Sequence, residues 1–394
     1  MTPPKVLVVH PGTQHAPRLA EALYNKGLLY LFRTGWAVSN NEPGKRAVGI
    51  PSNKLRTSFW LEASAVLAQK IWNNKELVWF WRNKIFQRLV PDKDIQAADI
   101  IIGFDTASHI LAQRACKQGK RIILEQSILD PEAKQEALRA MAMRYPKWAC
   151  EAKPRPSSIL SAERMEQRLA ERISVPSKYV GDSLTRFGVP HEKIFINPYG
   201  TNTLPGREIR PQSRGPKKCR FLFAGSVTGR KGVPLLLEAW AKVASPFTEL
   251  TIAGNMTGMP AVGPRLDNVR FLGQLSRKEM ASAFQENDVF VFPSYAEGMP
   301  LVVLEAMAAG LPVIATPVAE GVVHSWVNGI LIPFDAPVVL AEAMIWLAAD
   351  YKKRSILGQA AKQTAAEFSW KAYGDRYAAL LENMFVPFAS KKLL

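Results

Sequence analysis

Residues 289–312 read VFVFPSYAEGMPLVVLEAMAAGLP and predict a strand, a tight turn and a helix in immediate succession. The first four residues are only Val and Phe, which is typical of a buried parallel strand. Residues 301–309 follow the turn as an apolar helix, and Gly310 with Pro312 ends it. A strand that leads through a short turn into a helix is the repeating unit of α/β folds, so this stretch indicates an α/β protein.

Two carboxylates lie beside the turn. Glu297 is at its lip, and Glu305, eight residues later, is about one helical turn inside the helix. The free N–H groups and positive dipole end of a helix N-terminus favour an anion. We therefore interpret the pair as part of a site for a ligand with phosphate and hydroxyl groups, such as a nucleotide sugar. The alternative is one surface glutamate and one helix-capping glutamate.

A second loop, residues 225–232, has the sequence GSVTGRKG and joins a predicted strand at 221–224 to a predicted helix at 234–244. Its glycines allow the backbone to approach a ligand closely, and Arg230 and Lys231 can neutralise a diphosphate. The Gly-Lys-Ser/Thr end of a Walker loop is missing. A solvated Arg-Lys pair in a surface loop is the alternative interpretation.

Strands and helices alternate along the chain in two series. The first has predicted strands at 5–10, 28–33, 99–104, 121–124, one ending at 175–177, and 194–197, with predicted helices at 108–119, 131–144, 161–173 and 178–187 and a Pro-rich loop at 145–158. The second has predicted strands at 221–224, 250–253, 269–272, 289–292, 313–315 and 330–333, with further helices beginning at 276, 338 and 354. The polar, basic residues 201–218 between the two series predict an interdomain linker.

Composition indicates an ordinary soluble globular protein. The chain has 394 residues, of which 22% are charged and 47% apolar, so we expect two or three domains. No apolar run reaches about 20 residues, and the N-terminus lacks the pattern of a signal peptide. We therefore expect a cytoplasmic protein without a membrane span. Its three cysteines show neither metal-ligand nor disulfide spacing.

The net charge of +17 is unevenly distributed. Residues 1–200 contain 30 Lys and Arg against 18 Asp and Glu, or +12, which leaves +5 for the remainder. A basic half points to an anionic partner, such as a membrane surface, a phosphorylated substrate or a nucleic acid, and simple solubility is the alternative. Of these partners we expect peripheral contact with an anionic membrane rather than a nucleic acid.

Residues 59–90 combine aromatic and basic side chains and predict two helices. The segment contains Trp60, Trp72, Trp79 and Trp81, interleaved with Lys70, Lys75, Arg82, Lys84 and Arg88. Apolar residues recur at helical spacing at Phe59, Val66, Leu67 and Ile71, and again at Leu77, Trp81, Ile85 and Leu89. Trp and basic residues on one surface suit a helix that contacts lipid. The same apolar stripes could instead pack against a sheet.

Polar residues follow several predicted strands of the first series, where open α/β sheets bind their ligands. Gly12, Thr13 and Gln14 follow the first strand, and His109, Glu125 and Gln126 lie near the ends of two later ones. Gly12 can present backbone amides to a phosphate or sugar. The other residues can contact a ligand at this edge, although a local hydrogen bond at the start of a helix is the alternative for His109.

Several separated motifs, in the same order, make residues 161–384 resemble the family 4 glycosyltransferases. They are VPS at 175–177, FGVP at 187–190, PYG at 198–200, FAGS at 223–226 with RKG at 230–232, FLG at 271–273, the Glu-x7-Glu stretch at 293–313, and FSW at 368–370. This resemblance implies the GT-B fold: an acceptor-binding Rossmann-like domain at 1–200, the linker, and a nucleotide-sugar-binding domain at 219–370. It also implies that the first domain's candidate residues lie on the acceptor side, namely Thr13, Gln14, His109, Glu125 and Gln126. A final helix at 371–394 would cross back to the first domain.

The resemblance also implies roles for individual residues. Lys231 and Arg230 would bind the donor diphosphate, Glu297 would hold the transferred sugar, and Glu305 would bind the ribose. Gly298, Met299, Pro300 and Leu301 at the helix mouth, together with Gly225, Ser226 and Gly12, would complete the donor site. The expected donor is a UDP-, GDP- or ADP-sugar, and the chemistry is retaining, with no cofactor and no metal. Many members have Arg where this chain has Ser226, and many have His where this chain has Glu125 and Gln126.

The predicted function is therefore hexosyl transfer from a nucleotide sugar to an acceptor. The basic first half suggests a lipid-linked or envelope glycan as acceptor, as in polysaccharide biosynthesis, at the inner face of the membrane. Two other classes stay open: a different GT-B enzyme, such as a nucleotide-sugar epimerase or a phosphorylase, and a non-catalytic protein that binds a sugar or nucleotide.

Overall fold

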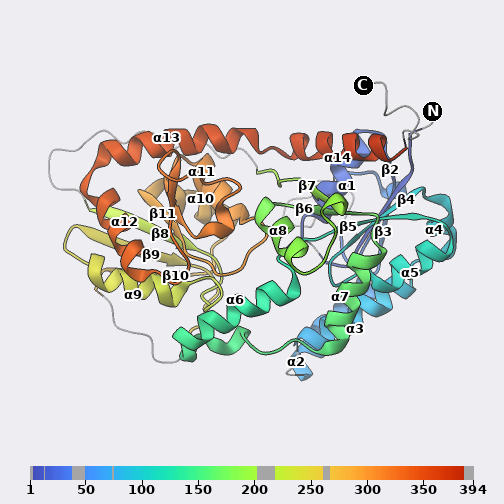
Figure 1. Cartoon of the computed structure of the whole chain (residues 1–394), viewed down its shortest axis with the longest axis horizontal. Helices are drawn as coiled ribbons and strands as arrows, with labels where there is room; N and C mark the ends of the chain where they lie inside the picture. The colour runs from blue at the N-terminus through green and yellow to red at the C-terminus, as the bar shows by residue number, and fades with distance from the viewer. Residues whose placement is uncertain are drawn as a thin grey trace.

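The computed structural model describes residues 3–12, 14–37, 49–72, 75–201, 218–260 and 267–385. These residues form two parallel β-sheets flanked by helices, which follow one another along the long axis of the molecule (Figure 1). The expected α/β architecture with two Rossmann-like domains is confirmed. Over the described ranges, no helix is both long and apolar enough to cross a membrane.

The N-terminal sheet has the strand order β3-β2-β1-β4-β5-β6-β7, and every recorded pairing in it is parallel. Its strands are β1 (Val6–His10), β2 (Leu29–Thr34), β3 (Leu55–Thr57), β4 (Ile100–Phe104), β5 (Arg121–Glu125), β6 (Arg172–Val175) and β7 (Ile194–Ile196). β1 and β4 are buried along their whole length, as expected for central strands covered on both faces. The strand order reverses between β1 and β4, so the crevice at their carboxyl ends is the expected ligand site of this domain.

Helices and short 3-10 turns connect these strands. They are α1 (Ala16–Asn25), η1 (Ser52–Lys54), α2 (Phe59–Ile71), α3 (Lys75–Arg88), α4 (Asp92–Ala97), α5 (His109–Lys117), α6 (Pro131–Arg144), η2 (Pro146–Glu151), α7 (Ser157–Leu169), α8 (Lys178–Arg186) and η3 (His191–Lys193). Two sequence predictions are corrected here. The helix predicted at 161–173 begins and ends four residues earlier, because β6 takes residues 172–175, and the loop predicted at 145–158 contains η2.

The C-terminal sheet has the strand order β10-β9-β8-β11-β12-β13 and is also parallel in every recorded pairing. Its strands are β8 (Cys219–Ala224), β9 (Thr248–Ala253), β10 (Val269–Gly273), β11 (Val289–Phe292), β12 (Val313–Ala315) and β13 (Gly329–Leu331). Its helices are α9 (Val233–Val243), α10 (Arg277–Glu286), α11 (Leu301–Ala308), η4 (Pro317–Ala319), α12 (Pro337–Ala349) and α13 (Tyr351–Glu367). The order reverses between β8 and β11, so the two loops singled out in the sequence both start at the switch point of this sheet.

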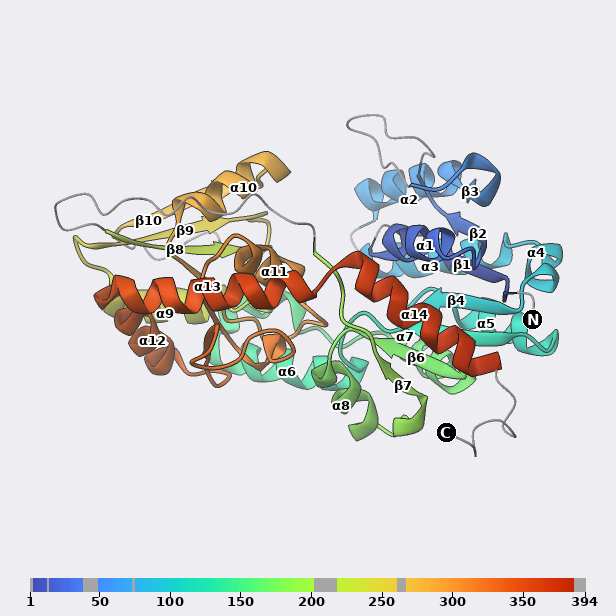
Figure 2. The same ribbon diagram turned by 90° about the horizontal axis from the view of Figure 1, so that it is seen from above.

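Each domain has a helix that packs against the other domain. The last helix, α14 (Trp370–Phe385), continues from α13 and lies along the N-terminal domain, as Figure 2 shows. A Cβ atom at Gly374 would come within 2.8 Å of the Ala22 Cβ in α1, so the two helices touch. In the opposite direction, α6 and η2 extend from the N-terminal domain beneath the C-terminal one (Figure 1), where Arg144 and Tyr145 both bind Glu238 of α9. The α14 crossing was expected from the sequence, and the α6 crossing was not.

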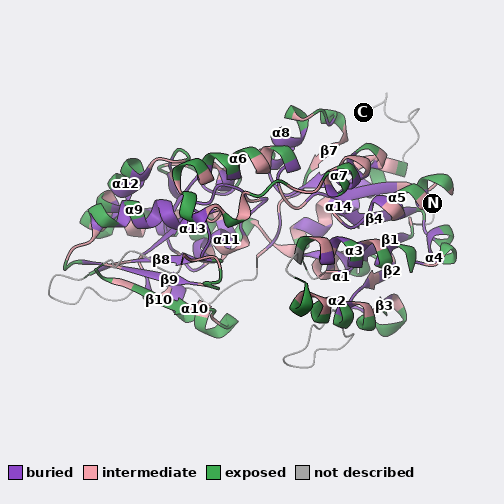
Figure 3. Cartoon of the chain, turned by 90° about the horizontal axis from the view of Figure 1, so that it is seen from below, coloured by how far each residue is buried: buried purple, intermediate pink, exposed green. Residues whose placement is uncertain are grey.

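The apolar stripes of residues 59–90 do not pack against a sheet. Figure 3 shows α2 and part of α3 exposed at the edge of the N-terminal domain. Phe80 and Phe86 of α3 are buried, whereas Leu67 and Ile71 of α2 and Trp81 of α3 lie in solvent. The sheet-packing interpretation was therefore wrong for these stripes, because a different face of α3 supplies the core contacts.

The domain borders remain a prediction. Residues 202–217, which make up nearly all of the predicted linker, and residues 386–394 of the predicted final helix lie outside the described ranges. Within those ranges, the strands of the N-terminal sheet end at Ile196 and those of the C-terminal sheet begin at Cys219.

Candidate active site

The loops after β8 and β11 touch each other at the switch point. Gly232 caps the N-terminus of α9 with φ +73°, a left-handed conformation that favours glycine. A Cβ atom there would lie 1.8 Å from the backbone oxygen of Pro293, which follows β11. The loops can approach this closely only because residue 232 has no side chain, and the approach brings the cations of one loop to the carboxylate of the other.

Arg230, Lys231 and Glu297 form a partly buried charge cluster. One oxygen of Glu297, Oε1, lies 2.6 Å from Arg230 Nη1 and 2.6 Å from Lys231 Nζ, and the Ser294 hydroxyl donates to it at 3.1 Å. Burial alone would raise the pKa of Glu297, but the two cations and the hydrogen bonds from Lys231 and Ser294 outweigh it and lower the pKa. Glu297 is therefore ionised, and it holds both cations at the mouth of α11.

A carboxylate from the other domain also binds Arg230. Glu151, the last residue of η2, accepts a hydrogen bond from the Arg230 backbone N–H at 3.2 Å, and its Oε1 lies 3.3 Å from Arg230 Nε. The cluster thus contains two cations and two carboxylates, with no net charge. A diphosphate would have to compete with Glu151 for the guanidinium group.

We expect the Glu151→Gln variant to bind nucleoside diphosphates about five- to tenfold more tightly than the wild type, because a partly screened charge near Arg230 opposes the incoming phosphates by roughly 1 kcal/mol. Isothermal titration calorimetry with UDP, GDP and ADP measures the change. Glu192→Gln, which neutralises an exposed carboxylate of η3, is the matched control. Unchanged or weaker binding by Glu151→Gln would show that this carboxylate does not oppose the ligand.

Glu305 lies in α11 in a different environment. No hydrogen bond or ion pair of its side chain is recorded within the described part of the chain, and its exposure is intermediate. Burial raises the pKa of its carboxyl group, and the charge of Arg277 partly opposes this rise. A half-buried carboxylate of this kind can accept hydrogen bonds from a pair of hydroxyl groups, as the ribose-binding prediction requires.

The turn after Glu297 contacts the N-terminal domain. The Ser177 hydroxyl donates to the Gly298 carbonyl at 2.8 Å, and a Cβ atom at Gly298 would lie 1.9 Å from the Ser127 carbonyl oxygen. The sulfur of Met299 is buried 3.2 Å from the Tyr199 backbone nitrogen. Two residues predicted to bind the donor therefore form the domain junction. Pro300 and Leu301 cap and begin α11, while Gly225 adopts φ +152° at the end of β8 and Ser226 is exposed beside it.

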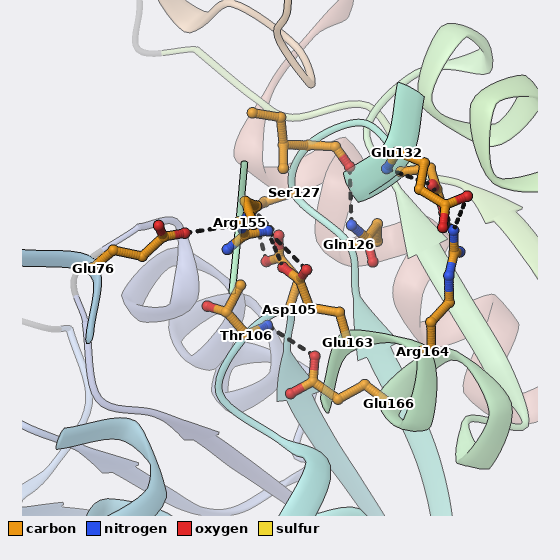
Figure 4. A network of polar contacts seen from close by, with 12 residues as sticks. Glu76, Asp105, Thr106, Gln126, Ser127, Glu132, Arg155, Glu163, Arg164 and Glu166 are labelled. Atoms are coloured by element: carbon orange, nitrogen blue, oxygen red, sulfur yellow. Dashed lines mark hydrogen bonds and ion pairs between the residues drawn. The ribbon is translucent and has the colours of Figure 1, made fainter. Parts of the chain in front are cut away.

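A buried polar network supports Ser127 at this junction (Figure 4). The Ser127 hydroxyl donates to both oxygens of Asp105, at 2.8 and 3.0 Å. Nearby, Arg155 binds Glu163 through both carboxylate oxygens, and the Glu166 carboxylate accepts from the backbone N–H of Thr106. Burial raises the pKa of Asp105, although the hydrogen bonds from Ser127 oppose this rise. The network fixes the edge of the N-terminal domain against which Gly298 rests.

Glu125 does not face a substrate. It is 1% exposed, and its carboxylate contacts His15 Nε2 at 2.7 Å and accepts from the hydroxyls of Tyr377 at 2.6 Å and Tyr373 at 3.3 Å. Both tyrosines belong to α14. The structure corrects its predicted acceptor-side role, because the crossing helix covers the carboxylate and uses it as an anchor.

Within the described ranges, the other predicted acceptor-side residues make no recorded hydrogen bond or ion pair with the charge cluster. Gln126 is buried, and its side chain donates to the Ile128 carbonyl at 3.0 Å. His109 begins α5 and stacks on Phe80. Its backbone N–H donates to Glu166 of α7, 57 residues away, so this bond joins two helices and is not the local one weighed as an alternative. Gly12 follows β1, Gln14 is exposed, and Thr13 lies outside the described residues.

His10 was missed by the sequence interpretation. It ends β1 at the ligand crevice of the N-terminal sheet, and both of its ring nitrogens are buried without a hydrogen-bond partner. Burial, together with the neighbouring His15 and Arg82, lowers the pKa of His10 from 6.5 to about 3. The ring is therefore neutral at physiological pH and offers one donor and one acceptor to a hydroxyl group.

This shift predicts an acid-sensitive contribution to stability. Because the folded pKa of His10 is below the unfolded one, the unfolded chain takes up the proton first, and stability falls as the pH drops below 6.5. Between pH 7 and pH 5 this residue should account for a loss of about 2 kcal/mol in the free energy of unfolding. Urea unfolding of His10→Phe, with the exposed His191→Phe as control, measures the difference. Equal pH dependence of wild type and His10→Phe would contradict the assignment.

Some residues of the site had no usable signal in the sequence. Glu151 lies inside the aperiodic Pro-rich stretch 145–158, and its position depends on the unexpected path of α6 and η2. Ser177 was recognisable as a helix cap directly after a strand, and it does cap α8 by accepting from the Val180 N–H. Metal-ligand spacing was not found in the sequence, and no cluster of three or more His, Cys, Asp or Glu side chains able to hold a metal ion occurs in the described ranges.

Solved structures share this two-domain arrangement over nearly the whole chain. Sucrose-phosphate synthase from Thermosynechococcus elongatus is 19% identical, the match covering 97% of this chain and 99% of that one with a TM-score of 0.66. Anabaena Alr3699/HepE in complex with UDP and glucose is 16% identical, with 96% and 100% covered and a TM-score of 0.65. At these identities the likeness defines the fold, which is the GT-B fold of glycosyltransferases.

Sequence comparison finds a family model that is similar to the second domain. Residues 218–350 match the model of the family described as "Glycosyl transferases group 1", which agrees with the resemblance inferred from the motifs. A D-inositol 3-phosphate glycosyltransferase of Corynebacterium urealyticum is 30% identical over 180 residues, which cover 41% of this chain and 42% of the relative. The aligned residues make up 42% of the length of this relative and 62% of that of a second D-inositol 3-phosphate glycosyltransferase, from Paenarthrobacter aurescens.

Proposed function

We propose that this protein is a retaining glycosyltransferase that moves a sugar from a nucleotide-sugar donor to an acceptor hydroxyl group. The observation that carries the proposal is the convergence of Arg230, Lys231 and Glu297 at the switch point of the C-terminal sheet. Two cations next to a helix N-terminus suit a diphosphate. The GT-B fold and the family match of residues 218–350 support this use of the site.

In the proposed reaction, Lys231 and Arg230 bind the diphosphate and stabilise the negative charge that develops on it as the sugar–phosphate bond breaks. The acceptor oxygen forms the new bond to the anomeric carbon, and its proton passes to the departing phosphate oxygen. Glu297 holds the hydroxyls of the transferred sugar, and Glu305 binds the ribose. The two cations take the part that a metal ion plays in other transferases, so we propose a metal-independent enzyme without a cofactor.

The proposed acceptor is a glycan or a lipid-linked glycan. It would enter from the N-terminal domain. The ligand crevice expected at the carboxyl ends of β1 and β4 lies on the side of the domain junction, where Ser127 contacts Gly298. A neutral His10 at the end of β1 can bind an acceptor hydroxyl. The protein would act at the inner face of a membrane, beside its lipid-linked substrate.

A donor screen tests the proposal. Thermal-shift measurements compare UDP-, GDP- and ADP-sugars. Sugars of one of these nucleotides should raise the melting temperature, because a ligand that binds only the folded state stabilises it. Incubation with that donor and lipid-linked or free glycans should then yield a glycosylated product. Epimerised donor without acceptor would instead indicate an epimerase, and phosphate-dependent cleavage of a glycan would indicate a phosphorylase. Binding without turnover would indicate a non-catalytic binder, and no binding to any nucleotide sugar would overturn the proposal.

A further inference from the structure

The N-terminal domain exposes an apolar surface on α2 and α3. Six large apolar side chains in these helices or directly after them are each more than half exposed: Trp60, Leu67, Ile71, Trp72, Trp81 and Leu89. We call these six residues the apolar face. Trp60 is 83% and Ile71 73% exposed, values that are unusual for large apolar residues. Apolar groups gathered on one surface in this way mark a place of contact with another molecule or with a membrane.

Two residues of the apolar face, Trp72 and Trp81, also line a groove between the two helices. This groove of about 410 Å³ is lined mainly by apolar side chains, among them Trp72, Trp81 and Ile85. On α3, Trp81, Ile85 and Leu89 recur every four residues and form one stripe. Lipid chains adapt to such an uneven apolar surface, and Trp rings favour the boundary between lipid headgroups and chains.

Positive charges border the apolar face. Lys70 lies in the last turn of α2 and Arg88 ends α3, and both are exposed. The ammonium group of Lys84 lies over the Trp81 ring, 4.7 Å from its centroid, with its stem along the apolar surface. These cations can contact the phosphate headgroups of a bilayer that touches the apolar face.

The acids of the two helices are turned away or neutralised. Glu62, on α2, is buried and binds Arg82 at 3.0 Å, and Glu76, on α3, binds Arg155 at 2.8 Å. Over the described side chains of α2 and α3, no exposed carboxylate is left without a cation beside it. The sign of the surface is thus positive, in keeping with the +12 charge of residues 1–200.

We propose that the apolar face and its bordering cations dock this protein on an anionic lipid bilayer, with α2 and α3 lying in the headgroup layer. Charge complementarity favours this occupant over a second copy of the chain, because two copies would bring surfaces of the same sign together. The two helices are about 20 Å long, sufficient to lie in the interface but too short and too charged to span the membrane.

The docking surface is directly connected to the acceptor side of the proposed site. A Cβ atom at Gly35 would lie 2.9 Å from a Glu62 carboxylate oxygen and 2.5 Å from the Pro11 carbonyl, so α2 rests against the loop that follows β1. A bilayer bound at α2 would therefore hold a lipid-linked acceptor near the carboxyl ends of β1 and β4. This part rests on the proposed function, whereas membrane docking does not.

Vesicle flotation of the full-length protein, without donor or acceptor, tests the docking. The probes are vesicles of phosphatidylcholine alone and of phosphatidylcholine mixed with phosphatidylglycerol. We expect binding to the anionic vesicles at low salt, weaker binding at high salt, and little binding to the neutral ones. Absence of binding to anionic vesicles at low salt would overturn the proposal, and equal binding to neutral vesicles would overturn the role of the bordering cations.

Matched variants locate the surface. Leu67→Glu/Ile71→Glu should lower the vesicle partition coefficient at least about tenfold, since it removes two apolar anchors and adds two negative charges. The control Met143→Glu/Ile356→Glu makes the same change in charge at two residues that are also largely exposed, outside α2 and α3, and should bind as the wild type. Lys70→Gln/Arg88→Gln should lose about 25-fold at roughly fivefold per cation. Equal loss in the control, or no loss in the first pair, would overturn the assignment.

Analytical ultracentrifugation distinguishes docking on a bilayer from pairing with a second copy of the chain. A wild type that is monomeric and binds vesicles supports docking on the bilayer. A dimer that Leu67→Glu/Ile71→Glu converts to a monomer, combined with no vesicle binding, would show that a second copy covers the face and would overturn the proposal. If the docking succeeds while no nucleotide sugar binds, the proposed function fails and the membrane surface stands.

Discussion

Replacing Lys231 by alanine is expected to lower kcat for sugar transfer by about 10²- to 10³-fold, the range found when one donor to a developing charge is removed. Lys231 Nζ lies 2.6 Å from the shared Glu297 oxygen, on the same side as Arg230 Nη1. Without Lys231, Arg230 is the one cation of the cluster that is left to neutralise the diphosphate. Glu151 already competes with the diphosphate for the Arg230 guanidinium group. The measurement is steady-state kinetics with the donor that the screen identifies.

The control for this variant is Lys242→Ala. Lys242 lies in the last turn of α9, the helix that follows the phosphate loop, and is exposed. This variant removes the same charge from the helix that follows the loop, away from the cluster, and it should leave kcat within about twofold of the wild type. Glu297→Ala should also reduce transfer by at least about tenfold. Normal turnover by both Lys231→Ala and Glu297→Ala would contradict the site assignment.

Replacing Glu125 by alanine should lower the free energy of unfolding by about 3–5 kcal/mol, because a fully buried charged network loses its central member. His15 and the hydroxyls of Tyr373 and Tyr377 would all lose their shared acceptor. The effect reaches across the chain, since the two tyrosines belong to α14 and His15 precedes α1. Chemical denaturation followed by Trp fluorescence measures it.

Two further variants test the reason for this loss. Tyr377→Phe removes one hydrogen bond to the charged group and should cost about 1.5–3 kcal/mol, less than Glu125→Ala. Glu382→Ala changes an exposed carboxylate of α14 and should stay within about 0.5 kcal/mol of the wild type. If Glu125→Ala were as stable as the wild type, the buried carboxylate would not anchor the crossing helix.

Local sequence signals predicted the fold well where one segment determines its own structure. The run of Val and Phe at β11 and the glycine stop after α11 are such cases. The two site loops were also recognisable, because both follow strands and combine glycines with charges. Their meeting at one switch point follows from the strand order, which the sequence alone does not contain.

The sequence interpretation failed where distant segments meet. Glu125 ends a strand and looked like a cleft residue, but α14, about 250 residues later, covers it. The sequence also did not predict that Gly298 and Met299 contact Ser127, Ser177 and Tyr199 of the first domain. In the Trp-rich helices the helical spacing was right, but spacing alone does not say which face of α3 turns inward.

The helices that cross between the two domains join them through buried contacts in both directions. Met141 and Trp148, from α6 and η2, belong to the same apolar cluster as the core of the C-terminal sheet, and Tyr373 of α14 joins that cluster from the other side. A chain cut between Thr201 and Lys218 would leave each fragment holding a helix that completes the other. The two pieces would stay associated after the cut and unfold in a single transition, as the halves of a split protein do.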